Sequence, residues 1–208
     1  MAQLFAVHPD NPQVRLLRQA AQLIDRGAVA AVPTDSCYAL ACHLDDKAAV
    51  DRVRRIRRVD ERHNLTLLCR DLTEIATYAR VDNTQYRLLK QATPGPYTFI
   101  LEATREVPRR LSHPSRKTIG IRIPANNVAL ALLDVLGQAL ISTTLLLPGD
   151  EIPMSDPTEI RGRLEHDIDL VVDGGPSGIE PTTVIDLTGR EAVVVRLGRG
   201  SLAAIGLE

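Results

Sequence analysis

Three hydroxyl groups and one carboxylate fall within five residues of the chain, at Thr34, Asp35, Ser36 and Tyr38. They follow an apolar run, 29–32, that predicts a buried strand, and Pro33, which ends the strand because it has no N–H to donate. In open α/β sheets, ligands bind in the loop beyond the carboxyl end of a strand. Taken alone, the cluster fits an ordinary Ser/Thr or Asx turn better. No histidine stands beside Ser36, so a nucleophilic serine is unsupported.

A strongly basic segment supplies the charge that an anionic ligand would need. Arginine occupies five of the seven positions from Arg52 to Arg58. Guanidinium groups bind phosphate through paired hydrogen bonds, although most of a charged helix face is ordinarily solvated. Arg57 and Arg58 are the better phosphate candidates because they end the predicted helix and border the next strand. If Arg57 points into a cleft, it is a phosphate ligand.

One further arginine, Arg122, interrupts the apolar strand predicted for 118–123. A buried and unpaired guanidinium is costly, so Arg122 needs either a carboxylate partner or an anionic ligand, and Asp35 is a candidate partner. Hydroxyl groups also gather in the turn 93–98 and at the strand end 142–144. The sequence contains no GxxxxGK[ST] phosphate loop.

The charge of the 208-residue chain is uneven, although its net value of −1 does not mark a polyanion-binding protein. Six arginines face two acids between residues 52 and 62, and six basic residues face one acid between 105 and 122. Between residues 150 and 173, eight acids face two arginines. Aromatic residues make up 3% of the chain and Trp is absent, which argues against base stacking on single-stranded nucleic acid.

The termini and cysteines indicate the compartment. The sequence shows no signal-peptide pattern, and no apolar run approaches the roughly 20 residues of a membrane span. Its three cysteines lack CxxC spacing, which favours structural thiols in a reducing compartment over a zinc site. We therefore expect a cytoplasmic protein with no membrane partner and no protein-held metal.

Strand and helix patterns interleave without strict alternation, which predicts an α/β protein with a twisted mixed sheet flanked by helices. No linker interrupts the chain, so a single domain, 1–208, is expected. The predicted strands are 4–7, 29–32, 38–44, 65–69, 97–102, 118–123, 140–145, 170–172, 183–187 and 192–196. Predicted helices begin at Asn11, Lys47, Asp71, Asp82, Val128 and Asp156.

Four segments together resemble the YrdC/YciO family over nearly the whole chain. They are Pro33–Leu40, Pro94–Thr98, Ile119–Pro124 and Pro181–Asp186, in this order. Three further segments, His8–Pro12, Thr66–Leu72 and Val107–Leu111, resemble the YciO branch. The resemblance implies a YrdC-like fold with a large, positively charged concave surface.

The resemblance also implies a chemistry. Synthases of the family condense L-threonine, bicarbonate and ATP into threonylcarbamoyl-adenylate and release pyrophosphate, and the product serves threonylcarbamoyladenosine modification of tRNA. ATP would carry Mg²⁺ as its counterion. The threonine amine attacks bicarbonate and the carbamate attacks the α-phosphate, so no covalent protein nucleophile is needed. Binding of double-stranded RNA is also described for the family.

Position by position, the resemblance assigns roles to residues of this sequence. The threonine pocket would be bordered by Thr34, Tyr38 and Thr98. The phosphate or nucleotide contacts would come from Arg57, Arg122, Thr144, Thr182, Thr183 and Arg196. The two arginine-rich segments add RNA-binding candidates: Arg54, Arg55, Arg58, Arg109, Arg110, Arg116 and Lys117.

Two positions depart from the synthase pattern. Val59 stands where synthases carry an arginine, and Leu146 stands where they carry an asparagine. Losing two polar phosphate contacts of ~1–3 kcal/mol each costs ~10²–10⁴ in affinity or rate. We therefore expect a nucleotide- and RNA-binding protein of threonylcarbamoyl-adenylate chemistry, either a weakened synthase or a hydrolase of the product. A non-enzymatic double-stranded RNA-binding protein and a nucleotide-binding partner subunit are the alternatives.

Overall fold

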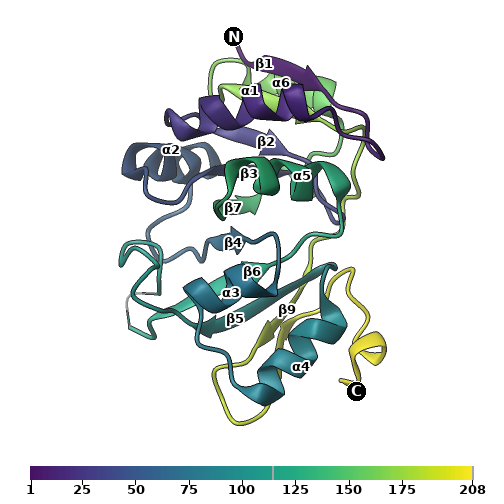
Figure 1. Cartoon of the computed structure of the whole chain (residues 1–208). Coiled ribbons are helices and arrows are strands. Elements are labelled where there is room, and N and C mark those ends of the chain that lie inside the picture. The colour runs from purple at the N-terminus through teal and green to yellow at the C-terminus, as the bar shows by residue number, and fades with distance from the viewer. Residues whose placement is uncertain (114, 208) are drawn as a thin grey trace.

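A single mixed sheet runs through the whole molecule (Figure 1). The computed structural model describes residues 1–113 and 115–207. Within these residues ten strands pair in the order β1-β8-β2-β3-β7-β4-β6-β5-β9-β10. The strands are β1 (Gln3–Ala6), β2 (Ala30–Val32), β3 (Ala39–His43), β4 (Thr66–Leu68), β5 (Tyr97–Glu102), β6 (Thr118–Arg122), β7 (Leu140–Thr144), β8 (Leu170–Asp173), β9 (Thr183–Asp186) and β10 (Val193–Arg196).

Parallel and antiparallel pairs alternate irregularly along this sheet. β1–β8, β8–β2, β4–β6 and β5–β9 are parallel, and the other five pairs are antiparallel. The predicted mixed sheet in a single α/β domain is confirmed. At one edge, the pairing of β10 with β9 shifts register between Val194 and Arg196.

Six α-helices of the described residues pack on the sheet: α1 (Val14–Asp25), α2 (Lys47–Arg57), α3 (Leu72–Tyr78), α4 (Asn83–Ala92), α5 (Asn127–Leu136) and α6 (Pro157–Leu164). A short 3-10 turn, Ala203–Ile205, lies near the C-terminus. Five of the helices begin at an Asp or Asn whose side chain accepts a backbone N–H of the first turn. These caps are the local signals that made most helix starts readable from the sequence.

The predicted start of the first helix at Asn11 was wrong. The helix begins at Val14, and Gln13 makes no capping bond through its side chain. The N–H groups of Asp10 and Asn11 instead donate to Nδ1 of His8, and the His8 N–H donates to Oε1 of Gln13. His8 thus closes a separate turn ahead of the helix.

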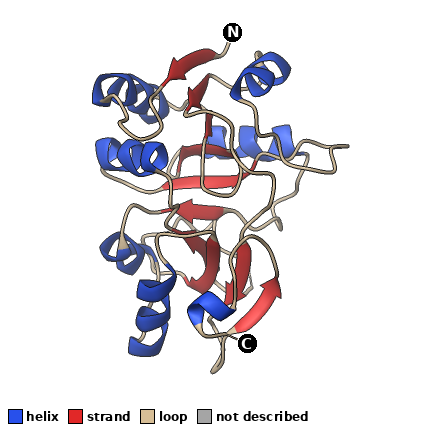
Figure 2. Cartoon of the chain, turned by 90° about the vertical axis from the view of Figure 1, so that its right-hand side faces the viewer, coloured by secondary structure: helices blue, strands red, loops and turns tan. Residues whose placement is uncertain are grey.

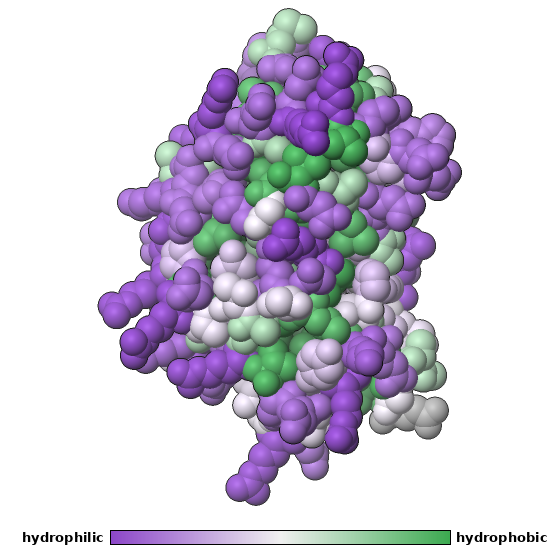
Figure 3. Space-filling view, in the orientation of Figure 1, coloured by the Kyte–Doolittle hydropathy of each residue, from purple (hydrophilic) through white to green (hydrophobic). Residues whose placement is uncertain are grey.

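Helices cover both faces of the half of the sheet that is uppermost in Figure 1 and contains β1, β8, β2 and β3. Leu17 of α1 and Leu132 of α5 share one buried cluster with Ala30 of β2. Val50 of α2 and Ile160 of α6 share the other cluster with Ala31, which points to the opposite face. On the face of the molecule shown in Figure 3, hydrophilic side chains surround apolar ones. The apolar side chains are visible between α1 and α5 and again near α4. Strands buried on both faces explain the nearly continuous apolar runs of the sequence.

The lower half of the sheet is covered on one face only. Ile75 of α3 and Leu89 of α4 belong to the same buried cluster as Phe99 and Ile121. Figure 2 shows helices on both sides of the upper half, whereas α3 and α4 stand on one side of the lower half. The opposite face of β4, β6 and β5 is therefore free to form a binding surface.

No helix in the described ranges combines the length and apolar character needed to cross a bilayer.

Candidate functional site

The uncovered face of the lower half-sheet is the floor of a cleft of about 640 Å³. This volume lies within the range of small-molecule sites. The floor is built mainly from alternate residues of four neighbouring strands: Thr66, Leu68, Thr98, Ile100, Thr118, Gly120, Arg122, Ser142 and Thr144. Because alternate strand residues share a face, the period-2 pattern delivers these side chains to one side. Arg57 is the one residue of the six helices that lines the cleft.

Gly120 makes room at the centre of this floor. A Cβ atom there would stand 3.0 Å from Oγ1 of Thr66 and 3.4 Å from Cγ2 of Thr98. A side chain at this position would therefore project into the space between β4 and β5 and fill part of the cleft.

The lining of the cleft is cationic. Five arginines contribute to it, Arg57, Arg62, Arg116, Arg122 and Arg196, together with His63 and His113. No Asp or Glu is among the described lining residues. Leu65, Ile100, Leu146, Val184 and Val195 add apolar surface. A cleft with this composition suits a ligand that carries both negative charge and an apolar ring or chain.

Arg57 points into the cleft, which makes it a candidate phosphate ligand. It is the last residue of α2, and its buried Nε atom has no hydrogen-bond partner among the described residues. Burial lowers the pKa of Arg57, because removal from water disfavours the charged form. An anion in the cleft would supply the missing partner.

Arg122 pairs with Asp35, as the sequence suggested. The guanidinium of Arg122 on β6 donates to Oδ1 of Asp35 in the loop after β2. Their side chains are 7% and 11% exposed, so the pair is nearly removed from water. Burial lowers the pKa of Arg122, and the Asp35 carboxylate opposes that shift. Nε of Arg122 and Oδ2 of Asp35 keep unused hydrogen-bonding capacity.

Thr182 and Arg196 line the cleft beside Thr98 of the floor. The hydroxyl groups of Thr98 and Thr182 lie 2.8 Å apart, and Nη2 of Arg196 donates to the Thr182 carbonyl oxygen at 2.9 Å. Thr183, the next residue, lies outside the cleft lining, because its hydroxyl donates to the Gly200 carbonyl oxygen at 2.6 Å. Of the predicted phosphate contacts, the structure brings together all except Thr183: Arg57, Arg122, Thr144, Thr182 and Arg196.

The loop after β2 is divided between structure and cleft. Thr34 is 3% exposed and lies outside the lining. Its hydroxyl donates to the Cys37 carbonyl oxygen and accepts the Ser36 and Cys37 N–H groups, which makes an ordinary Ser/Thr turn. Tyr38 lines the cleft, but its hydroxyl donates to the Gly175 carbonyl oxygen at 2.8 Å, and burial raises its pKa. Of the three predicted threonine-pocket residues, Tyr38 and Thr98 meet in the cleft.

Sequence reasoning missed three neighbouring cleft residues, Arg62, His63 and Asn64. They follow α2 in a loop with no regular structure. Nε2 of His63 lies 3.4 Å from Oγ1 of Thr143. Burial lowers the pKa of His63, and the positive charges of Arg57 and Arg54 lower it further. The signal available in the sequence was the polar run 60–64, which lies between the arginine-rich helix and the next strand and could have been predicted to line the cleft.

The predicted RNA-binding residues occupy several different environments. Nη2 of Arg54, which is 8% exposed, donates to the Arg110 carbonyl oxygen, and Nη2 of Arg110 donates to the Leu44 carbonyl oxygen. These two are turned inward. Arg116 lines the cleft, while Arg109 and Lys117, which belong to the same segment between β5 and β6, are exposed.

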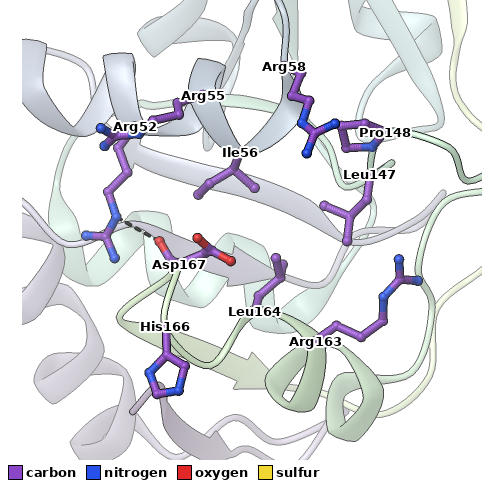
Figure 4. A pocket seen from close by; sticks show the side chains of 10 residues that line it. All are labelled: Arg52, Arg55, Ile56, Arg58, Leu147, Pro148, Arg163, Leu164, His166 and Asp167. Atoms are coloured by element: carbon purple, nitrogen blue, oxygen red, sulfur yellow. Dashed lines mark hydrogen bonds between the residues drawn. The ribbon is translucent and has the colours of Figure 1, made fainter.

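Arg55 and Arg58 line a separate groove of about 600 Å³ between α2 and the end of α6 (Figure 4). Its other arginines are paired. Arg52 donates to Asp169 at 2.7 Å and to the Asp167 carbonyl oxygen, and Arg163 lies 2.9 Å from Asp150 and 3.6 Å from Glu159. Asp167 also lines this groove. Its positive charge is therefore largely compensated by carboxylates.

Metal-ligating side chains do not cluster in the part of the chain that the structure describes: no three of His, Cys, Asp or Glu gather there. Cys37, Cys42 and Cys69 are buried as free thiols. Burial raises the pKa of Cys37, which lines the cleft, so this thiol stays protonated at neutral pH.

Comparison with known proteins identifies the family. Residues 22–198 match the Sua5_yciO_yrdC family model, described as telomere recombination. The chain belongs to the Sua5/YciO/YrdC family. It is 54% identical to YciO of Escherichia coli (strain K12) over 202 residues, which is 97% of this chain and 98% of that protein. The resemblance seen in the sequence is confirmed.

One further relative links the chain to the synthases of the Sua5/YciO/YrdC family. The chain is 32% identical over 182 residues to the threonylcarbamoyl-AMP synthase of Halorhodospira halophila, which covers 86% of this chain and 93% of that protein.

Solved structures of the family agree with the fold. The crystal structure of E. coli YciO gives a TM-score of 0.94 over 99% of this chain and 100% of that chain. P. abyssi Sua5 complexed with L-threonine gives a TM-score of 0.86 at 25% identity, over 94% of this chain and 57% of that chain.

Proposed function

We propose that the cleft binds an adenine nucleotide, ATP or an adenylate, together with L-threonine, and that it supports threonylcarbamoyl-adenylate chemistry at a weakened rate. The observation that carries this proposal is a cleft whose described lining contains five arginines and no Asp or Glu. Such a lining attracts polyphosphate, and Arg57, Arg62 and Arg116 form no ion pair among the described residues that would compete for it. Mg²⁺ would enter as the counterion of ATP. Relatives named as threonylcarbamoyl-AMP synthase and a Sua5 structure with L-threonine support the substrate class.

The protein's own part in this reaction is positioning and charge stabilisation. Arg57, Arg122 and Arg196 are placed around one cleft, where they would hold the phosphates and stabilise charge that develops on the α-phosphate. Thr98 and Thr182 offer two neighbouring hydroxyls in the same cleft. Leu65 and Ile100 offer an apolar surface for a base. No nucleophilic side chain is required.

The weakened rate rests on Leu146. This residue lines the cleft, so an apolar side chain occupies the position where synthases carry an amide. Val59, by contrast, lies outside the cleft lining. One lost polar contact of ~1–2 kcal/mol corresponds to roughly a tenfold loss.

The experiment that tests the proposal is pyrophosphate release from ATP with L-threonine and bicarbonate. We expect slow, threonine-dependent release that Arg57→Ala abolishes and Leu146→Asn raises about tenfold. Val59→Arg is the matched control, because it restores the other synthase residue outside the cleft, and it should leave the rate within about twofold. Turnover that does not need threonine would contradict the proposal. Rapid consumption of added threonylcarbamoyl-adenylate, without synthesis, would assign the cleft to hydrolysis.

A second proposal concerns RNA. Arg109, Arg116 and Lys117 are exposed along the segment between β5 and β6, and Arg116 also lines the cleft. Basic side chains in this arrangement suit contacts with duplex phosphates, and the scarcity of aromatic residues favours shape recognition. We expect affinity for duplex RNA or tRNA to fall steeply between 50 and 200 mM salt and to weaken in a variant with all three residues changed to Ala. Salt-independent binding would contradict it.

A further inference from the structure

The way in which α2 ends determines which of the residues after the helix reach the cleft. Arg58 adopts a left-handed backbone with φ of 49°. The Arg58 N–H donates to the Arg55 carbonyl oxygen, and the Val59 N–H donates to the Arg54 carbonyl oxygen at 3.0 Å. This is the Schellman ending of a helix, in which the second residue after the helix favours an apolar side chain. Val59 occupies that position and lies outside the cleft lining.

A turn anchored by Asp60 then returns the chain to the cleft. Oδ1 of Asp60 accepts the Arg62 N–H at 2.9 Å and the His63 N–H at 3.2 Å. The two bonds fix the backbone of the turn. The three residues that follow Glu61 consequently line the cleft: Arg62, His63 and Asn64.

The Arg62 guanidinium has no competing partner. It is exposed at the cleft, and no ion pair or side-chain hydrogen bond holds it within residues 1–113 and 115–207. Arg57 lines the same cleft as Arg62. Burial and the positive charges of Arg57 and Arg54 lower the pKa of His63, and the Asp60 carboxylate opposes that shift only in part. The Asp60 carboxylate is engaged by backbone N–H groups and forms no ion pair with Arg62 among the described residues, so positive charge gathered in this way favours a bound anion.

We propose that Arg62 binds a phosphate group of the nucleotide and supplies the charge that Val59 does not. The assignment rests on the proposed nucleotide function and adds a residue to it. Arg57 enters the cleft from the end of α2, and Arg62 enters it from the turn held by Asp60. A phosphate in the cleft would then be contacted by both guanidiniums. Phosphate recognition is then moved three residues along the chain, from position 59 to position 62.

Titration calorimetry with two probes, ATP with Mg²⁺ and inorganic pyrophosphate, tests this assignment. We expect Arg62→Ala to weaken the binding of both probes about tenfold, and Arg62→Lys to retain affinity within about threefold of the wild type. Arg87→Ala is the matched control, because Arg87 is an exposed arginine on α4, outside the cleft lining. It should change affinity by less than about twofold.

The two proposals fail in different ways. If Arg62→Ala binds pyrophosphate as tightly as Arg87→Ala does, the assignment of Arg62 is overturned. If the wild type binds pyrophosphate but not ATP, and Arg62→Ala weakens that binding, the nucleotide function falls and Arg62 remains an anion ligand. If the wild type binds neither probe, both proposals are overturned.

Discussion

The cleft and the groove between α2 and α6 are alike in size and in arginine content, yet they differ in counter-charge. The cleft measures about 640 Å³ with five arginines, and the groove about 600 Å³ with four. In the groove, Asp167 lines the wall and Asp150, Glu159 and Asp169 pair with arginines. In the cleft, only Arg122 has an acidic partner among the described residues. The two hollows therefore differ less in arginine content than in the number of carboxylates that face their arginines.

The largest expected effect comes from the single ion pair of the cleft. Asp35→Asn leaves the Arg122 guanidinium buried without its carboxylate, which should lower the free energy of unfolding by about 3 kcal/mol in the ligand-free protein. Asp167→Asn, at an exposed carboxylate of the groove, should change it by less than about 0.5 kcal/mol. Urea denaturation measures both. Equal effects would mean that the two hollows do not differ in burial of charge.

Two arginines that are adjacent in the sequence, Arg57 and Arg58, line different hollows and can serve as a matched pair of variants. Arg57 lines the cleft and Arg58 lines the groove. Arg57→Ala should weaken ATP binding by about 10–100-fold, because a charge-assisted contact of ~1.5–3 kcal/mol is lost, whereas Arg58→Ala should stay within about twofold. Isothermal titration of the two variants measures the difference. Similar losses at both positions would place the nucleotide across the helix end rather than in the cleft.

His63 makes anion binding in the cleft dependent on pH. Burial and the charges of Arg57 and Arg54 hold its pKa below the ordinary value, while Asp60 opposes this shift. A bound anion favours the imidazolium and raises that pKa, so binding takes up a proton and tightens as pH falls. We expect wild-type affinity for pyrophosphate, relative to His63→Asn, to rise about threefold from pH 8 to pH 6. A constant ratio would show that His63 does not sense the ligand.

The smallest effect concerns the end of α2. Arg58→Gly removes the cost of a left-handed backbone at a non-glycine residue and should stabilise the protein by about 0.5–1 kcal/mol, net of the added freedom of the unfolded chain. Thermal denaturation measures this gain. Because Arg58 lines the groove and not the cleft, ATP affinity should be unchanged. A loss of affinity would mean that the groove also contributes to nucleotide binding.

Most of the fold and part of the cleft could be predicted because their signals are local. Asp and Asn caps mark the helix starts, and an arginine in an apolar strand requires a partner, which Asp35 provides. The remaining features depend on distant groups. Thr183 turns away because its hydroxyl meets Gly200, and Arg54 turns inward because it meets the Arg110 carbonyl oxygen. Arg62 enters the cleft because of the way in which α2 ends, and no sequence motif predicts that ending.

The register shift in β10 bears on how this protein behaves at high concentration. β10 is the last strand of the sheet, and Val193, Val194 and Val195 on it are exposed. A regular apolar edge strand offers unpaired backbone groups to another chain and invites aggregation. The shift between Val194 and Arg196 twists the strand and interrupts its ladder after two residues. The irregular edge thus keeps a valine-rich strand from serving as a template for further strands.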